Sequence, residues 1–124
     1  MCRKRVPIIE RMFFSTYEFD KQWKRMGLSD EDQRRLENEI LSNPKIGTVI
    51  RGTGSLRKMR FAIDGKGKSG SARVLYVDFV VFERVYLIYV YTKGQKDNIS
   101  AEERDIFKQI IEQAKKELGG RDNE

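Results

Sequence analysis

Residues 54–92, GSLRKMRFAIDGKGKSGSARVLYVDFVVFERVYLIYVYT, decide the fold of this chain. Residues 54–63 alternate in character, which predicts a strand with Lys58 and Arg60 on one face and mainly apolar side chains on the other. Residues 64–71, DGKGKSGS, are glycine-rich and basic and hold no apolar side chain to bury. They therefore predict an exposed hairpin loop.

Two further strands follow this loop. Residues 73–82 and 85–92 are rich in β-branched and aromatic residues, which favour strands, and a turn at Glu83 and Arg84 separates them. Arg73 opens the first of these two strands. The whole segment therefore predicts an antiparallel meander of three strands.

Two capping signals mark the starts of helices outside the meander. Ser29 stands three residues before Asp32, and Ser100 stands three residues before Glu103. In each pair the hydroxyl can accept a hydrogen bond from the first turn, while the acid favours the positive end of the helix dipole. The helix after Ser29 should end at residues 43–44, because proline cannot continue it. The helix after Ser100 should end at the glycines at 119–120.

The remaining elements complete the expected fold. Residues 11–17 predict a strand, and a short helix should follow through Phe19, Trp23 and Met26. The expected order is β-α-α-β-β-β-α. We therefore predict an α+β fold, with a small antiparallel sheet and helices packed on one of its faces.

Positive charge is concentrated in the middle of the chain. The stretch from Lys45 to Lys96 holds eleven Lys or Arg residues against three acids, a charge of +8, whereas the whole chain carries +6. Clustered Lys and Arg side chains neutralise phosphates and release condensed counterions, so this pattern indicates a polyanion partner. A well-solvated surface without a partner is the alternative explanation.

Length and composition are those of one compact domain. The chain has 124 residues, 39% hydrophobic and 35% charged, enough for a single core. The lone Cys2 excludes an internal disulfide, and no apolar run approaches the roughly 20 residues that cross a bilayer. We expect a soluble cytoplasmic protein. Without histidine the chain has no recognisable set of metal ligands, and we expect no cofactor.

Three passages together resemble a known family. They are GTGSLRKMR at 52–60, GKGKSGSARVLY at 65–76 and YTKGQKDNIS at 91–100. With them the chain resembles the HigB-type branch of the RelE/ParE superfamily, the toxins of bacterial type II toxin–antitoxin modules. The resemblance implies one RelE-like toxin domain at residues 11–118, with a basic extension at 1–10 and a tail at 119–124.

The resemblance implies an activity and its partners. Toxins of this kind are mRNA interferases, endoribonucleases that cut translated messages on the ribosome and are silenced by a cognate antitoxin encoded by an adjacent gene. Because this chain has no histidine, an imidazole-based mechanism is excluded. The ribose 2′-hydroxyl would attack the adjacent phosphate and leave a 2′,3′-cyclic phosphate. Two alternatives stay open: a non-catalytic protein that binds RNA or the ribosome, and a ParE-like toxin that inhibits gyrase.

The resemblance also implies the catalytic residues. The basic pair of the family falls on Lys58 and Arg60, and its central arginine falls on Arg73. Lys58 is the candidate proton acceptor, because an arginine with a pKa above about 12 does not release its proton. Arg60 and Arg73 would hold the phosphate oxygens. Lys93 would donate a proton to the departing 5′-oxygen, with Tyr91 as the neighbouring aromatic residue.

Four further basic residues are assigned to RNA binding. They are Arg57, Lys66, Lys68 and Lys96. Lys66 and Lys68 lie in the glycine-rich loop, which is too mobile to position a base and is better suited to hold an RNA backbone. The choice between Lys93 and Lys96 as the C-terminal catalytic group stays open, as does the role of residues 1–10.

Tyr91 also has a purely structural interpretation. It continues the alternation of Val85, Leu87 and Tyr89, so it could be a core-facing aromatic residue of the last strand. The alternation in the sequence does not decide between this interpretation and a position beside Arg73.

Overall fold

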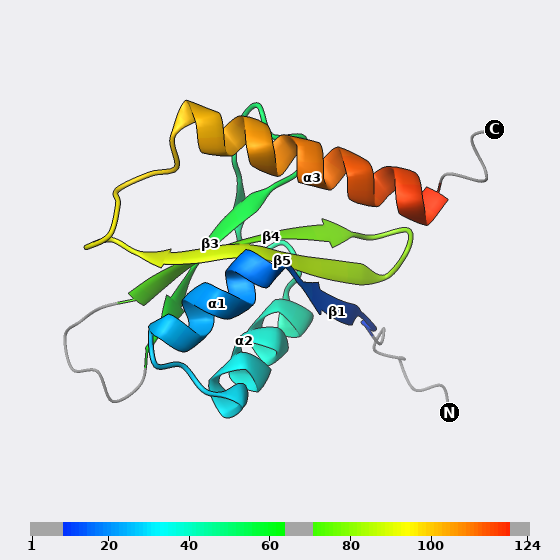
Figure 1. The fold of residues 1–124 in the computed structure, drawn as a ribbon. Helices are drawn as coiled ribbons and strands as arrows, with labels where there is room; N and C mark the ends of the chain where they lie inside the picture. The colour runs from blue at the N-terminus through cyan, green and yellow to red at the C-terminus, as the bar shows by residue number, and fades with distance from the viewer. Residues whose placement is uncertain (1–8, 64–70, 120–124) are drawn as a thin grey trace, which may run out of the picture.

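The structure is a computed structural model that describes residues 9–63 and 71–119. In chain order its elements are β1 (Met12–Ser15), α1 (Tyr17–Arg25), α2 (Asp30–Ser42), β2 (Thr48–Val49), β3 (Arg57–Ala62), β4 (Ser71–Phe79), β5 (Arg84–Thr92) and α3 (Ala101–Gly119). The strands form one sheet in the order β1-β5-β4-β3-β2 (Figure 1). The α+β class and the antiparallel meander of β3, β4 and β5 are confirmed.

Helices cover both faces of the sheet. Val74, Leu75, Tyr76 and Val77 of β4 are all fully buried. Val74 and Tyr76 join the core under α1 and α2, whereas Leu75 and Val77 join the core under α3. Figure 1 shows α3 above the sheet and the other two helices below it. The prediction of helices on one face is therefore wrong, because a strand with an unbroken apolar run such as Val74 to Val77 is buried on both sides.

The sheet also differs from the expected one at its edges. β1 pairs with β5 in parallel, from Met12 opposite Arg84 to Ser15 opposite Leu87, so the sheet is mixed and not purely antiparallel. At the other edge, β2 pairs with the start of β3 and adds a strand that the sequence did not predict. A strand of only two residues, such as β2, has no alternation pattern of its own, and its pairing depends on contacts from elsewhere in the fold.

Both predicted capping boxes are present. The Ser29 hydroxyl accepts a hydrogen bond from the Asp32 amide at 3.1 Å, and the Asp32 carboxylate accepts one from the Ser29 amide at 2.8 Å. The same two bonds join Ser100 and Glu103, at 3.1 and 2.8 Å. These reciprocal bonds satisfy backbone donors that the first turn of a helix leaves free. They define where α2 and α3 begin.

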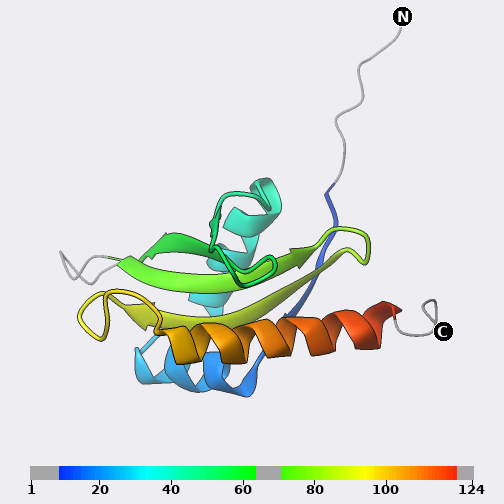
Figure 2. The same cartoon turned by 90° about the horizontal axis from the view of Figure 1, so that it is seen from above.

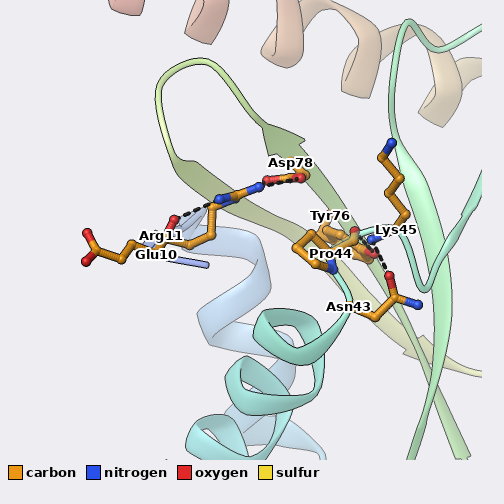
Figure 3. Close-up of polar contacts among 7 residues, drawn as sticks. All are labelled: Glu10, Arg11, Asn43, Pro44, Lys45, Tyr76 and Asp78. Atoms are coloured by element: carbon orange, nitrogen blue, oxygen red, sulfur yellow. Dashed lines mark hydrogen bonds and ion pairs between the residues drawn. The ribbon is translucent and has the colours of Figure 1, made fainter. Parts of the chain in front are cut away.

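Tyr76 anchors the segment that leads from α2 into β2 (Figure 3). Its buried hydroxyl donates a hydrogen bond to the Pro44 carbonyl at 2.7 Å and accepts one from the Gly47 amide at 3.0 Å. Residue 47 has to be glycine because a β-carbon there would lie 2.9 Å from the ring of Tyr76. One side chain of β4 therefore holds the segment against which β3 is aligned.

A second side chain of β4 holds the start of β1. The Arg11 guanidinium forms a fork with the Asp78 carboxylate, with Nε–Oδ1 at 2.6 Å and Nη2–Oδ2 at 3.2 Å (Figure 3). The side chains are only 10% and 4% exposed. A bidentate, charge-assisted pair of this kind is both strong and geometrically specific. It joins β1 to β4 although β5 lies between them in the sheet.

An extra residue in β5 changes which side chains share a face. Along the β4–β5 ladder Leu75 pairs with Tyr89, but its neighbour Tyr76 pairs with Leu87. Ile88 is therefore unpaired and forms a β-bulge. Leu87 faces α1 and α2, whereas Ile88 and Tyr89 both face α3. A bulge redirects the side chains that follow it. Here it reverses the face of the sheet on which each later side chain of β5 would otherwise lie.

Thr16 satisfies the backbone at this bulge. Its hydroxyl donates a hydrogen bond to the Ile88 carbonyl at 2.7 Å, and its amide donates one to the Leu87 carbonyl at 3.0 Å. The same hydroxyl accepts a hydrogen bond from the Phe19 amide and so caps α1. One threonine thus starts α1 and supports the irregular point of β5, which couples the two elements.

We predict that Tyr76→Phe destabilises the fold. The change removes one hydroxyl and leaves the Gly47 amide and the Pro44 carbonyl buried without that partner, which should lower the free energy of unfolding by about 1–3 kcal/mol. Urea denaturation measures this loss. Tyr17→Phe is the matched control, because Tyr17 is 75% exposed and should change stability little. Equal stability of the two variants would contradict the prediction.

Candidate functional site

Three predicted site residues form one row across the sheet on the α3 face. Arg60 of β3 lies directly opposite Arg73 of β4, and Arg73 lies directly opposite Tyr91 of β5. Their chain neighbours on each strand belong to the core on the other side of the sheet. Residues directly opposite each other in an antiparallel pair have Cβ atoms about 5 Å apart. Three segments that are distant in sequence are thus brought together.

Lys58 lies in the adjacent row on the same face. It is paired with Leu75, which places it diagonally across from Arg73, at about 7–8 Å between backbones. Its ammonium group donates a hydrogen bond to the Asn98 side-chain oxygen at 3.3 Å. Asn98 comes from the loop between β5 and α3, so this loop contacts the basic face of the sheet.

The opposed arginines are electrostatically unfavourable as they stand. Like charges directly across a strand pair repel each other. Arg73 donates hydrogen bonds to the Ser71 carbonyl at 3.3 Å and to its hydroxyl at 3.2 Å, and Arg60 is exposed. Among the described residues no carboxylate forms an ion pair with either guanidinium. A bound anion would relieve this repulsion, which makes the row a candidate phosphate site.

Tyr91 is both a core residue and a neighbour of this row. It is 1% exposed, and its hydroxyl is buried without a hydrogen-bond partner. Burial raises the pKa of the phenol, while the nearby charges of Arg73 and Lys96 act to lower it. The net direction is upward, so the phenol is protonated at neutral pH. The simple alternation that the sequence suggested is broken by the bulge, and this break places Tyr91 beside Arg73.

Lys96 lies against the same aromatic side chains. Its ammonium nitrogen is 5.2 Å from the ring centre of Tyr89 and 6.0 Å from that of Tyr91, and it forms an ion pair with Glu103. The hydrogen bond that Lys96 donates to Glu103 raises the pKa of Lys96, so this lysine stays charged at neutral pH. Lys93 differs: it is exposed in the turn after β5 and makes no hydrogen bond or ion pair with another described residue.

Arg57, another predicted RNA-binding residue, does not join this cluster. Arg57 faces the opposite side of the sheet, and its guanidinium donates a hydrogen bond to the Gly47 carbonyl at 2.6 Å. Its contact is therefore with the segment before β2. Lys66 and Lys68 lie outside the described residues.

Three residues of the cluster were not predicted from the sequence. Tyr89 was assigned only to the alternation of β5, and Asn98 carries no local signal that would single it out. Glu103 was recognised as a capping residue, but its second contact, with Lys96, depends on the path of the loop. Such contacts arise from tertiary structure and have no pattern in the local sequence.

Two general features of the described residues bear on the type of site. They contain no group of three or more Cys, Asp or Glu residues that could hold a metal ion. No helix within residues 9–63 and 71–119 is long and apolar enough to cross a membrane.

A comparison with protein families matches residues 10–119 to the family described as the RelE toxin of the RelE/RelB toxin–antitoxin system. The chain belongs to the RelE toxin family. This confirms the resemblance of the chain to the RelE/ParE superfamily.

Solved structures of RelE toxins are similar to this chain. The E. coli toxin RelE, solved in the free state with two arginines changed to alanine, has a TM-score of 0.50 and 17% identity, over 71% of this chain and 88% of that one. The intact E. coli RelBE toxin–antitoxin complex has a TM-score of 0.47 and 18% identity, over 66% of this chain and 95% of that one. The isolated E. coli RelE toxin has a TM-score of 0.46 and 19% identity, over 81% of this chain and 98% of that one. At this identity, the first of these similarities supports the RelE fold.

We predict that Arg60→Thr stabilises this RelE-family protein while weakening its binding to polyanions. Removing one of two opposed guanidinium groups relieves repulsion, which should raise the free energy of unfolding by a few tenths of a kcal/mol. Binding to single-stranded RNA should weaken, with a smaller salt dependence. Urea denaturation and a salt series of binding measurements test both effects.

The control for Arg60→Thr is Arg34→Ala. Arg34 is exposed on α2, on the opposite side of the sheet, so this change removes the same charge away from the row. We expect unchanged RNA binding, apart from a small effect of net charge. Equal weakening by both changes would show that the row has no special affinity for polyanions.

Proposed function

We propose that this protein is the toxin of a toxin–antitoxin pair and acts as a ribosome-dependent endoribonuclease on messenger RNA, in the manner of the HigB-type branch. The observation that carries the proposal is the row in which Arg60 and Arg73 oppose each other without a carboxylate partner among the described residues. Lys58 lies beside this row and Tyr91 continues it. These are the residue types that phosphate binding and phosphate-ester chemistry require.

The reaction is an attack of the ribose 2′-hydroxyl on the adjacent phosphate. A bond forms between the 2′-oxygen and phosphorus, the bond to the 5′-oxygen breaks, and the products are a 2′,3′-cyclic phosphate and a free 5′-hydroxyl. Arg60 and Arg73 bind the phosphate oxygens, since an arginine fork holds two oxygens at once. Their charge stabilises the extra negative charge of the transition state.

Proton transfer falls to the lysines. Lys58 lies next to the arginine row and accepts the proton of the 2′-hydroxyl, because a lysine can exchange a proton and an arginine cannot. Lys93 donates a proton to the departing 5′-oxygen. Lys96 is less suited to that task, because the hydrogen bond that it donates to Glu103 raises its pKa and makes it a weaker acid. We assign Lys96 to binding and charge stabilisation.

The ribosome supplies what the cluster lacks. Arginine and lysine side chains bind a phosphate well, but the in-line geometry of a 2′-hydroxyl attack has to be imposed on a flexible RNA chain. Holding the reacting atoms in that geometry can account for several kcal/mol of the barrier. Messenger bound in the decoding site of a ribosome is held in a fixed path, whereas naked RNA is not. This requirement places the toxin in the cytoplasm.

We expect the purified protein to cut message on programmed ribosomes and to leave naked RNA nearly intact. Arg73→Ala should lower the cleavage rate by about 10²-fold, because it removes a charge that stabilises the transition state. Primer extension locates the cuts, and a cyclic-phosphate assay identifies their ends. Arg34→Ala, with a charge removed on the other side of the sheet, should cleave at the wild-type rate. If a folded Arg73→Ala protein cleaves at the wild-type rate, the catalytic assignment of Arg73 is excluded. If the wild-type protein binds ribosomes without cleaving message, a non-catalytic protein is favoured.

We also expect a cognate antitoxin. A toxin that cuts messages must be inhibited in the cell that makes it, and the E. coli RelBE structure is that of a toxin bound to its antitoxin. A small protein encoded beside this gene should bind with nanomolar or better affinity and restore growth when the two are co-expressed. It could cover Lys58, Arg60 and Arg73, or block entry into the ribosome from another side. If no adjacent gene product co-purifies or restores growth, the toxin–antitoxin assignment loses its partner.

A further inference from the structure

We propose that Glu103 is a positioning residue of the cleavage site, which fixes the ammonium group of Lys96 beside the arginine row. The inference rests on the proposed function, because it assigns Glu103 a role in that reaction. Glu103 lies at the start of α3, on an element that contributes none of the basic residues of the row. Its role follows from two contacts that a single carboxylate makes at once.

The two oxygens of Glu103 have different partners. Oε1 accepts a hydrogen bond from the Ser100 amide at 2.8 Å, which is half of the capping box of α3. Oε2 forms the ion pair with Lys96 Nζ. The capping contact fixes the orientation of the carboxylate relative to the helix. Lys96 is therefore held by a group that is itself locked to the backbone, and not by another flexible surface side chain.

Aromatic rings define the other side of the Lys96 position. The ammonium group lies over Tyr89, and the ring of Tyr89 packs on Phe107 of α3 with centroids 5.6 Å apart. Tyr91, the neighbour of Arg73, is also within 6.0 Å of the ammonium group. Carboxylate and rings together place the charge of Lys96 next to the end of the row.

Both members of the pair are charged at neutral pH. Burial acts to raise the pKa of Glu103, but the hydrogen bonds from Lys96 and from Ser100 outweigh it, and the net direction is downward. The side chains are 27% and 28% exposed, so the pair remains accessible from solvent. An ammonium group has three N–H donors, and Glu103 occupies one of them, which leaves donors for a phosphate oxygen.

Fixing this charge has a kinetic benefit. A free lysine side chain samples many rotamers and has to be ordered when the transition state forms, which costs conformational entropy. Glu103 orders the side chain of Lys96 before RNA binds, so this cost is not part of the activation barrier. The expected signature is a change in the rate of cleavage at saturation, with little change in the binding of the ribosome.

The first test is Glu103→Gln. Glutamine can still accept the hydrogen bond from the Ser100 amide, so the helix start is kept, but the negative charge beside Lys96 is lost. We expect about a 10-fold lower kcat on programmed ribosomes, an unchanged KM and a melting temperature close to that of the wild type. Glu102→Gln is the matched control. It removes the same charge from the same turn of α3, at an exposed position, and should leave kcat unchanged.

The second test asks whether Glu103 acts through Lys96. In a Lys96→Met background, Glu103→Gln should cause no further loss of cleavage, because the group it positions is gone. An independent reading comes from the protein without ribosomes: NMR titration of the Lys96 side chain should give a lower pKa in Glu103→Gln than in the wild type, since the hydrogen bond that raises this pKa is weakened.

The outcomes separate the two proposals. If the wild type cleaves and Glu103→Gln lowers kcat equally with and without Lys96, or leaves the titration of Lys96 unchanged, the role of Glu103 is overturned and the proposed function stands. If the wild type binds ribosomes but does not cleave, the proposed function fails, and with it any role of Glu103 in cleavage. The inference is supported if Glu103→Gln lowers kcat only when Lys96 is present and also shifts the titration of Lys96.

Discussion

The bulge at Ile88 is the constraint on which the rest of the site depends. Side chains alternate strictly along a regular strand, so without an extra residue in β5 the two ends of that strand would keep one register. The extra residue lets Val85 and Leu87 fill the core under α1 and α2, while Tyr89 and Tyr91 face α3. Removing the bulge would separate the aromatic side chains from Arg73. The cost of the irregular backbone is offset by the hydrogen bond from Thr16, which also serves the start of α1.

The basic row shows a conflict between stability and the proposed function. Opposed arginines on neighbouring strands are a poor choice for a stable sheet, and the described residues supply no carboxylate to neutralise them. The chain tolerates this repulsion where the core beneath is well packed, next to the fully buried Leu75. By contrast, the charges that hold the fold together are paired, as in the fork of Arg11 with Asp78. Paired charges support the architecture, whereas the unpaired arginines of the row form the candidate site.

Much of the fold could be predicted from local sequence signals. The capping boxes at Ser29 and Ser100 involve residues three apart, and the alternation of β3 correctly placed Lys58 and Arg60 on the face opposite Arg57. The continuous apolar run of β4 contained the information that both faces are covered, although the prediction placed all helices on one side. The assignment of Arg57 to RNA binding rested on charge alone, whereas its position on the other face followed from the alternation.

What could not be predicted depends on pairing between distant segments. Ile88 and Tyr89 are both favourable strand residues, so nothing in the sequence marks one of them as unpaired. The short β2 forms because Tyr76, which is 29 residues away from Gly47, anchors the chain beside it. The contact between Lys96 and Glu103 spans a loop whose path has no periodicity. These features arise when the sheet is assembled, and they are the ones that shape the candidate site.

The parallel pairing of β1 with β5 has a consequence for the order in which the protein folds. Arg11 and Asp78 are 67 residues apart, and Thr16 and the Ile88 carbonyl are 72 apart. Closing such long loops costs more entropy than forming the hairpins of β3, β4 and β5, so we expect β1 to join the sheet after these hairpins have formed. During synthesis β1 cannot pair until β5 has emerged from the ribosome. The bulge is completed only then, and an unfinished chain contains no assembled site.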